Sequence, residues 1–208
     1  MFISLAQLVS QLVNEGWLKT PKIIEAFLKI KREDFLPEEI KDFAYLDEAL
    51  SIGYSQTISQ PLVVAFMLEL LSPQEGEKIL DIGSGSGWTT SLLSYLAGDK
   101  GKVIGIEKIK ELKEFGENNI KKYNFIKKDV AKVILGDGYQ GFKEEAPYDK
   151  ILISASASKI EEEWLKQLKI NGKMVLPINN EIIRLEKLSE KEKKMERYPG
   201  FVFVPLVK

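Results

Sequence analysis

The sequence contains no cysteine and no histidine among its 208 residues. The absence of cysteine excludes disulfide bonds, thiol nucleophiles and zinc sites built on thiolates. The absence of histidine removes the side chain that most often moves protons near neutral pH. Any catalysis therefore depends on carboxylates, hydroxyls, lysines, amides or a bound cofactor, and we expect no metal site.

Long apolar runs and a strong excess of one charge are also missing. No apolar stretch approaches the roughly 18 residues that span a bilayer, and the N-terminus lacks the basic region and apolar core of a secretion signal. We therefore expect a cytoplasmic protein, acting as a monomer, that does not bind membranes. The formal net charge of -1 argues against a dominant nucleic-acid-binding surface, so we expect no nucleic-acid partner.

What the sequence does contain, from about residue 77, is an alternation of apolar strands with helices. This alternation predicts an α/β fold, a Rossmann-like, doubly wound and mostly parallel sheet. The predicted strands are 78–82, 102–107, 130–135, 148–154 and 173–178, and the predicted helices are 88–96, 109–119 and 160–168.

Two further regions flank this core in a single predicted domain, 1–208. Residues 1–60 predict an N-terminal helical extension on the substrate side, with an irregular segment over 44–58, and residues 61–208 form the core. Near the C-terminus, 181–188 and 198–207 predict an antiparallel hairpin at the sheet edge. The charged run 189–196 between them is interpreted as a solvated turn, with a partner-binding surface as the alternative.

The strand at 78–82 leads into a turn with three alternating glycines, Gly83-Ser-Gly85-Ser-Gly87. Glycine tolerates positive φ and lets a ligand approach the backbone closely. The spacing differs from the G-x-G-x-x-G of dinucleotide sites, and the Gly-Lys-Ser/Thr of a phosphate-binding loop is absent. Asp81 would repel a pyrophosphate but suits a cationic amino-acid group. With Asp81, the turn resembles the first motif of S-adenosyl-L-methionine-dependent methyltransferases. This resemblance implies that S-adenosyl-L-methionine is bound by Asp81, Gly83, Ser84, Gly85 and Gly87. The alternative is a glycine-rich turn without a ligand.

Two more acidic residues lie where the next two strands end. Glu107 follows Gly87 by twenty residues and can accept both hydroxyls of a ribose. Asp137, preceded by Gly136, can accept a hydrogen bond from the adenine amino group. Either acid would also serve as a cap at a strand end. Ligands of open α/β sheets bind beyond the carboxyl ends of strands, so the two positions together favour the cofactor.

A polar segment, Ser51-Ile-Gly-Tyr-Ser-Gln-Thr-Ile-Ser-Gln-Pro61, precedes the core. Taken alone, the segment is better explained by Ser59 capping a helix that begins at Pro61 than by a substrate site. With other stretches, however, the segment resembles the protein-L-isoaspartate (D-aspartate) O-methyltransferase family. The matching stretches are 34–37, 44–45, 51–61, 79–88, 103–107, 136–138, 148–149, 172–177 and 203–206.

This resemblance implies S-adenosyl-L-methionine as cofactor and L-isoaspartyl residues of damaged proteins and peptides as substrates. It implies that Ser59 lies at the methyl-acceptor site and that the strands at the C-terminal end of the sheet are arranged atypically. The surrounding predicted substrate-binding residues are Ser55, Gln56, Thr57, Ile58 and Gln60.

The sequence departs from the family pattern at four places. Arg32-Glu33-Asp34 stands where the family usually has Arg-His, and Trp88 stands where Tyr or Phe is common. The stretch 154–158 alternates serine and alanine where the family is alanine-rich, and 178–180 lacks an expected glycine. Because the stretch 154–158 is polar, one alternative remains, in which the protein is a methyltransferase of this fold that acts on RNA or a small molecule.

The missing histidine is compatible with carboxyl methylation. A carboxylate with a pKa of about 4 is already ionised at neutral pH and needs no general base. A non-catalytic cofactor-binding module remains the second alternative, because an intact cofactor pattern does not by itself require turnover.

Overall fold

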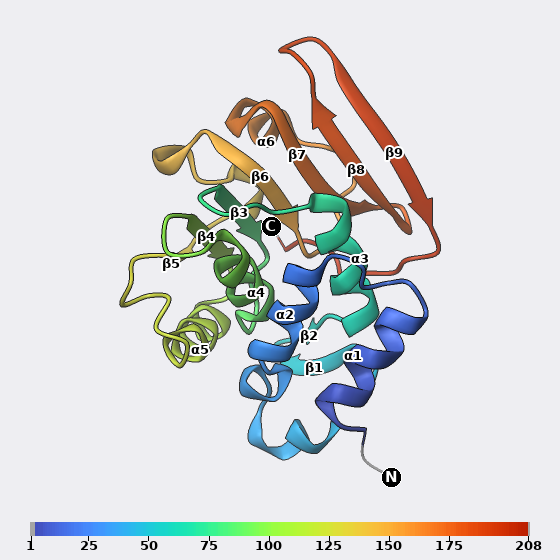
Figure 1. Ribbon diagram of the computed structural model, residues 1–208. Helices are drawn as coiled ribbons and strands as arrows, with labels where there is room; N and C mark the ends of the chain where they lie inside the picture. The colour runs from blue at the N-terminus through green and yellow to red at the C-terminus, as the bar shows by residue number, and fades with distance from the viewer. Residues whose placement is uncertain (1–2, 208) are drawn as a thin grey trace.

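The computed structural model describes residues 3–207 (Figure 1). Within these residues, a seven-stranded sheet has the order β5-β4-β3-β6-β7-β8-β9. Strands β3 to β7 run parallel, and β8 and β9 are antiparallel additions at one edge. The predicted fold class is therefore confirmed. The strands are β3 (Lys78–Ile82), β4 (Lys102–Glu107), β5 (Ala131–Leu135), β6 (Tyr148–Ile153), β7 (Leu168–Ile178), β8 (Glu181–Lys187) and β9 (Lys193–Pro199).

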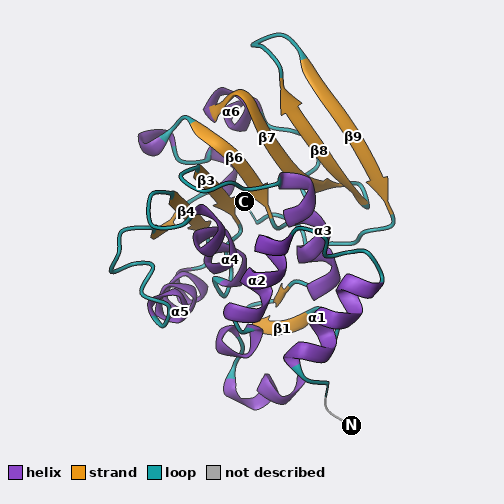
Figure 2. Ribbon diagram, viewed as in Figure 1, coloured by secondary structure: helices purple, strands orange, loops and turns teal. Residues whose placement is uncertain are grey.

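Helices cover both faces of this sheet. Side chains of a strand alternate between faces, and in β3 the buried Ile79 packs with α1 to α4 while Leu80 packs with α6 on the other face. Figure 2 shows α1 to α4 close together and α6 apart from them. The helices are α1 (Leu5–Asn14), α2 (Pro21–Lys29), α3 (Pro61–Leu71), α4 (Trp88–Ala97), α5 (Lys110–Lys121) and α6 (Glu162–Gln167), with 3₁₀ turns η1 (Arg32–Phe35), η2 (Glu38–Phe43), η3 (Gly138–Gln140) and η4 (Lys143–Glu145). None of the helices in residues 3–207 is long and apolar enough to cross a membrane.

The sheet reverses its direction of winding at β3. The chain adds β4 and β5 on one side of β3 and then returns to place β6 on the other side. In open α/β sheets, ligands bind at such a switch point, beyond the carboxyl ends of the strands. The glycine turn 83–87 lies at this position because it directly follows β3.

The segment 44–58, predicted to be irregular, contains a small hairpin. Strand β1 (Leu50–Gly53) pairs antiparallel with β2 (Gln56–Ile58). Tyr54 and Ser55 close the turn with φ values of 54° and 57°. Positive φ at two non-glycine residues is uncommon, so the sequence carried little signal for this turn.

The predicted second strand of the C-terminal hairpin, 198–207, is wrong. The strand is β9, over 193–199, which begins within the charged run 189–196 and overlaps the predicted strand only at 198–199. Most residues of this edge strand are exposed, and Tyr198, which packs on Phe66, is its one partly buried aromatic residue, so the strand shows no apolar alternation. Lysines suit such an edge. Gly200, with a φ of 100°, then turns the chain, and residues 201–207 run back across the sheet. Ser156 holds this tail through hydrogen bonds with Val204 (2.8 Å) and Leu206 (2.9 Å).

Candidate active site

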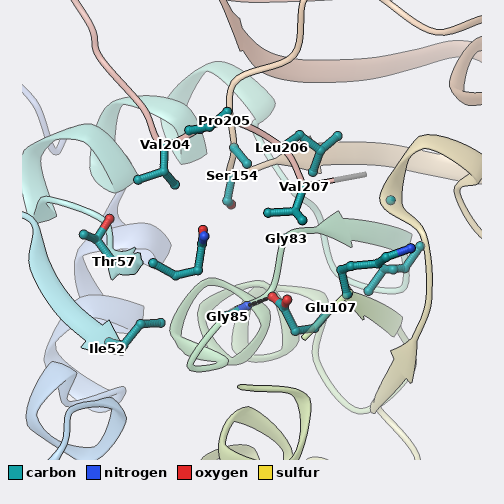
Figure 3. Close-up of a pocket in the computed structure, with 15 residues that line it drawn as sticks. Ile52, Thr57, Gly83, Gly85, Glu107, Ser154, Val204, Pro205, Leu206 and Val207 are labelled. Carbon is teal, nitrogen blue, oxygen red and sulfur yellow. Dashed lines mark hydrogen bonds between the residues drawn. The ribbon is translucent and has the colours of Figure 1, made fainter. Parts of the chain in front are cut away.

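A hollow lies beyond the carboxyl end of β3, and we call it the central hollow. About 520 Å³ of space lies between its walls, and part of this space is open to solvent. Figure 3 shows Ile52 and Thr57 on one side, Glu107 on the other and the C-terminal tail above. The lining residues are Ile52, Gln56, Thr57, Gly83, Gly85, Ile106, Glu107, Lys108, Gly138, Ser154, Ala155 and Val204 to Val207.

Two of the three glycines of the turn face the central hollow. Gly83 and Gly85 have φ values of 79° and 51°, which side chains other than glycine rarely adopt. Gly87 does not line this hollow. A Cβ atom on Gly87 would lie 2.8 Å from the carbonyl oxygen of Gly116 in α5, so close packing explains this glycine. The predicted cofactor contact of Gly87 stays a prediction.

Glu107 is anchored to the glycine turn. Its side chain is buried, and one carboxylate oxygen accepts a hydrogen bond from the backbone N–H of Gly85 at 2.9 Å. The other oxygen accepts from the backbone N–H of Ile109, also at 2.9 Å. The structure therefore presents a carboxylate of fixed orientation at the wall of the central hollow.

Asp81 is fully buried behind the turn. Its Oδ2 accepts hydrogen bonds from the hydroxyls of Thr89 (2.9 Å) and Thr90 (2.6 Å). Burial raises the pKa of Asp81 to about 6, against the opposing effect of these hydroxyls and that of Ser154. Its Oδ1 has no hydrogen-bond partner among residues 3–207, and neither has the buried Oγ of Ser84. These orphaned oxygens fit a ligand that donates hydrogen bonds, such as one with an ammonium group.

Gly136 and Asp137 line a separate hollow beside the central one, and the two hollows share Ile106. Asp137 accepts a hydrogen bond from the backbone N–H of Tyr139 (3.0 Å) and so caps η3. Gly136 donates its N–H to the carbonyl of Glu107 (2.9 Å). The capping alternative for Asp137 therefore describes a contact of the structure, and its adenine contact stays a prediction.

Ser59 lies between the glycine turn and the surface. It lines an inner hollow with Ser84 and an outer hollow with Gln60. Thr57 and Ser154 line the central, inner and outer hollows alike. The inner hollow is lined by 57–59, 83–86, 88–89 and 154, and the outer hollow by Ala49, Thr57, Ser59, Gln60, Val63, Ser154, Val202, Phe203 and Val204.

The other predicted substrate-binding residues do not all line the same hollow. Gln56 lines the central hollow and the buried Ile58 lines the inner one, whereas Ser55 is exposed at the hairpin turn and lines none of these three hollows. The residue that caps α3 is Gln60, without a side-chain capping bond. The alternative in which Ser59 caps this helix is therefore wrong.

Arg32 and the C-terminal tail also belong to the site, although neither carried a predicted role. Arg32 is 1% exposed, and its guanidinium donates hydrogen bonds to four backbone carbonyls around the hairpin. Burial lowers the pKa of Arg32 to about 10, and Asp47 opposes this change, so the group is charged at neutral pH. The tail escaped prediction because its contacts depend on the turn at Gly200, which no periodicity marks.

A family model described as protein-L-isoaspartate(D-aspartate) O-methyltransferase matches residues 4–208. The chain belongs to this family. The protein-L-isoaspartate O-methyltransferase of Methanopyrus kandleri is 42% identical over 205 residues, which are 97% of this chain and 90% of the relative.

Two solved structures share the architecture. One protein-L-isoaspartate O-methyltransferase superposes with a TM-score of 0.87 at 26% identity, covering 99% of this chain and 66% of that chain. A putative protein-L-isoaspartate O-methyltransferase from Plasmodium falciparum, in complex with S-adenosyl-L-homocysteine, superposes with a TM-score of 0.83 at 28% identity, covering 96% of both chains. The family match confirms the predicted family and enzyme class, and the ligand of the Plasmodium structure agrees with the predicted methyl donor.

Proposed function

We propose that this protein transfers a methyl group from S-adenosyl-L-methionine to the free α-carboxylate of L-isoaspartyl residues in damaged proteins and peptides. The amide nitrogen of the next peptide bond then attacks the ester carbonyl and expels methanol, which gives a succinimide. Addition of water to the succinimide restores some normal aspartate. The observation that carries the proposal is the inner hollow, where Ser59 and the glycine turn line the same space. Family membership supports the choice of acceptor.

The central hollow suits the methyl donor. We assign the ribose hydroxyls to Glu107, the amino group to Asp81 with Ser84, and the backbone approach to Gly83, Gly85 and Gly87. The adenine is assigned to the neighbouring hollow with Gly136 and Asp137. When bound, S-adenosyl-L-methionine supplies a methyl carbon made electrophilic by the positively charged sulfur.

The acceptor carboxylate requires alignment more than activation. It is ionised at neutral pH, so no residue has to remove a proton. The Ser59 hydroxyl donates a neutral hydrogen bond that orients the carboxylate without placing a positive charge on its nucleophilic lone pair. Ser55, Gln56, Thr57, Ile58 and Gln60 complete the acceptor segment. Proximity and orientation of this kind contribute about 7–11 kcal/mol.

The proposal is tested with an isoaspartyl peptide beside its normal aspartyl twin. We expect methylation of the first peptide alone. Ser59→Ala is expected to lower kcat/KM about tenfold, the value of one hydrogen bond of about 1.4 kcal/mol, with S-adenosyl-L-homocysteine affinity unchanged. The matched control is Ser158→Ala, because Ser158 is exposed and does not line the central, inner or outer hollow. Equal methylation of both peptides, or of neither, would refute the function, and wild-type kinetics in Ser59→Ala would refute the role of Ser59.

One alternative is a methyltransferase that acts on RNA or a small molecule. The polar stretch 154–158 supports it, because Ser154 lines the central, inner and outer hollows. Methyl incorporation into RNA instead of the isoaspartyl peptide would favour it. A non-catalytic cofactor-binding module would bind S-adenosyl-L-homocysteine without any turnover. We further propose one domain over 1–208 that acts as a monomer in the cytoplasm.

A further inference from the structure

Arg32 is a buried cation whose hydrogen bonds all go to one segment of main chain. Nη1 donates to the carbonyls of Ala44 (2.8 Å) and Leu46 (3.3 Å). Nη2 donates to the carbonyls of Glu48 (2.8 Å) and Ser59 (3.1 Å). Three of these carbonyls precede the β1–β2 hairpin and the fourth follows it. One side chain therefore ties together both ends of the segment 44–60, which we call the acceptor segment.

Only a guanidinium suits this arrangement. Its five N–H donors lie in a rigid plane, so one group serves several carbonyls at fixed angles. A lysine ammonium is a compact point charge with three donors on a flexible stem. Burying a charge is costly unless it is hydrogen-bonded, and the four carbonyls offset that cost. The four main-chain carbonyls that Arg32 binds therefore explain why a charged side chain is buried at this position.

The same side chain also contacts the cofactor side of the site. The guanidinium carbon lies 5.4 Å from the centre of the Trp88 ring, within the range of cation–π attraction. Trp88 is the first residue of α4 and directly follows Gly87. Its indole N–H donates to the carbonyl of Ile30 at 3.3 Å, which ties it to the segment that carries Arg32.

We propose that Arg32 is a positioning residue that holds the acceptor segment, 44–60, against the glycine turn, so that the Ser59 hydroxyl faces the methyl donor. The hydrogen bonds from Arg32 to the four carbonyls support the first part of this proposal, that Arg32 holds the segment. Its consequence for turnover rests on the proposed function.

The test compares Arg32→Lys with wild type in two measurements. The first is amide hydrogen exchange of peptides that cover 44–60, which needs no substrate. We expect exchange there to become at least tenfold faster, while peptides from β3 to β6 stay unchanged. The second is steady-state kinetics with the isoaspartyl peptide. We expect kcat to fall on the order of 100-fold, as for a misplacement of about 1 Å, with S-adenosyl-L-homocysteine affinity within threefold of wild type.

Lys187→Met is the matched control. Lys187 is also a buried cation on main-chain carbonyls, 3% exposed and bonded to Leu165 (3.0 Å) and Leu168 (3.1 Å). It lies at the end of β8 beside α6, and Figure 1 shows α6 far from β1 and β2. A general loss of stability would affect both variants, so Lys187→Met is expected to keep wild-type exchange in 44–60 and wild-type kcat. If Arg32→Lys does not fold, Arg32→Gln removes the buried charge and takes its place.

The outcomes separate this proposal from the proposed function. Unchanged exchange in 44–60 overturns the holding role of Arg32. Faster exchange with wild-type kcat overturns the positioning role and leaves Arg32 a structural residue. A wild-type protein that methylates no isoaspartyl peptide overturns the proposed function, and the exchange measurement then still decides whether Arg32 holds the segment.

Discussion

Replacing Glu107 by glutamine changes its charge and hydrogen bonding while nearly preserving its shape. In the structure, both carboxylate oxygens already accept a backbone N–H, from Gly85 and from Ile109, at 2.9 Å each. A carboxylate has about four lone-pair sites, so it retains acceptor capacity for ribose hydroxyls. A glutamine amide has one oxygen and one NH₂ group. One backbone N–H then faces a donor, and the ribose loses half of its acceptors.

The expected loss follows from these contacts. Hydrogen bonds to a charged group contribute about 1.5–3 kcal/mol each. Losing one such bond to the ribose corresponds to an affinity about 10- to 150-fold lower, at about 1.4 kcal/mol for each factor of ten. Because Gly85 is held by the same carboxylate, the disturbed turn adds to this loss rather than reducing it.

Isothermal titration calorimetry with S-adenosyl-L-homocysteine measures the effect directly. The control is Asp149→Asn, since Asp149 also holds a backbone N–H, that of Lys78 at 2.9 Å, but lines none of the hollows of the site. We expect its affinity for the ligand to equal that of wild type. An affinity of Glu107→Gln within threefold of wild type, in a folded protein, would refute the assignment of the ribose to Glu107.

Two further predictions concern stability. Burial raises the pKa of Asp81 in the folded protein to about 6 from its ordinary value of 3.8, so the folded protein binds this proton more tightly than the unfolded chain does. The contribution of Asp81 to stability is therefore largest below about pH 4 and is lost as the pH rises to about 6. In urea denaturation without ligand, Asp81→Asn is therefore expected to gain about 3 kcal/mol relative to wild type between pH 4 and pH 7, and a pH-independent difference would contradict this. Gly116→Ala should lower the melting temperature and weaken S-adenosyl-L-homocysteine binding, because the new Cβ would lie 2.5 Å from the carbonyl oxygen of Gly85. Glycine-to-alanine changes in helices usually stabilise by about 0.5–1 kcal/mol, so a higher melting temperature would show that the two backbones separate easily.

The sequence predicted the parallel core well because its strands are buried. Runs such as 78–82 and 102–107 are mostly apolar and buried, as is typical of central parallel strands. Each run contains or leads directly into residues with a predicted cofactor role, so the strand pattern and the site prediction agree. The same reasoning placed Gly83, Gly85 and Glu107, which the structure brings to one hollow. The predicted strand ends differ from those of the structure by a few residues at most, except at β7, which begins at Leu168.

Prediction failed where no burial pattern exists. Most residues of strand β9 are exposed, and only Glu196 and Tyr198 are partly buried, so its charged residues gave no strand signal. The β1–β2 turn uses positive φ at Tyr54 and Ser55 instead of glycine. Arg32 could not be assigned from spacing, because its partners are carbonyl oxygens of residues 12 to 27 positions away and carry no sequence signature.

The need for alignment in place of a general base explains both the missing histidine and the two buried charged residues, Glu107 and Arg32. An ionised acceptor needs no general base, so rate depends on how well two segments are aligned across the hollow. Glu107 fixes the glycine turn through the N–H of Gly85, and Arg32 fixes the acceptor segment through the carbonyl of Ser59. Both charged groups are buried, and both bond main-chain atoms of the segments they hold. Loss of either anchor should therefore reduce alignment, and the two losses should differ in kind. The Glu107 variant should lose affinity for S-adenosyl-L-homocysteine, whereas the Arg32 variant should lose kcat at unchanged affinity. Parallel losses of affinity in both variants would show that the two segments move as one unit.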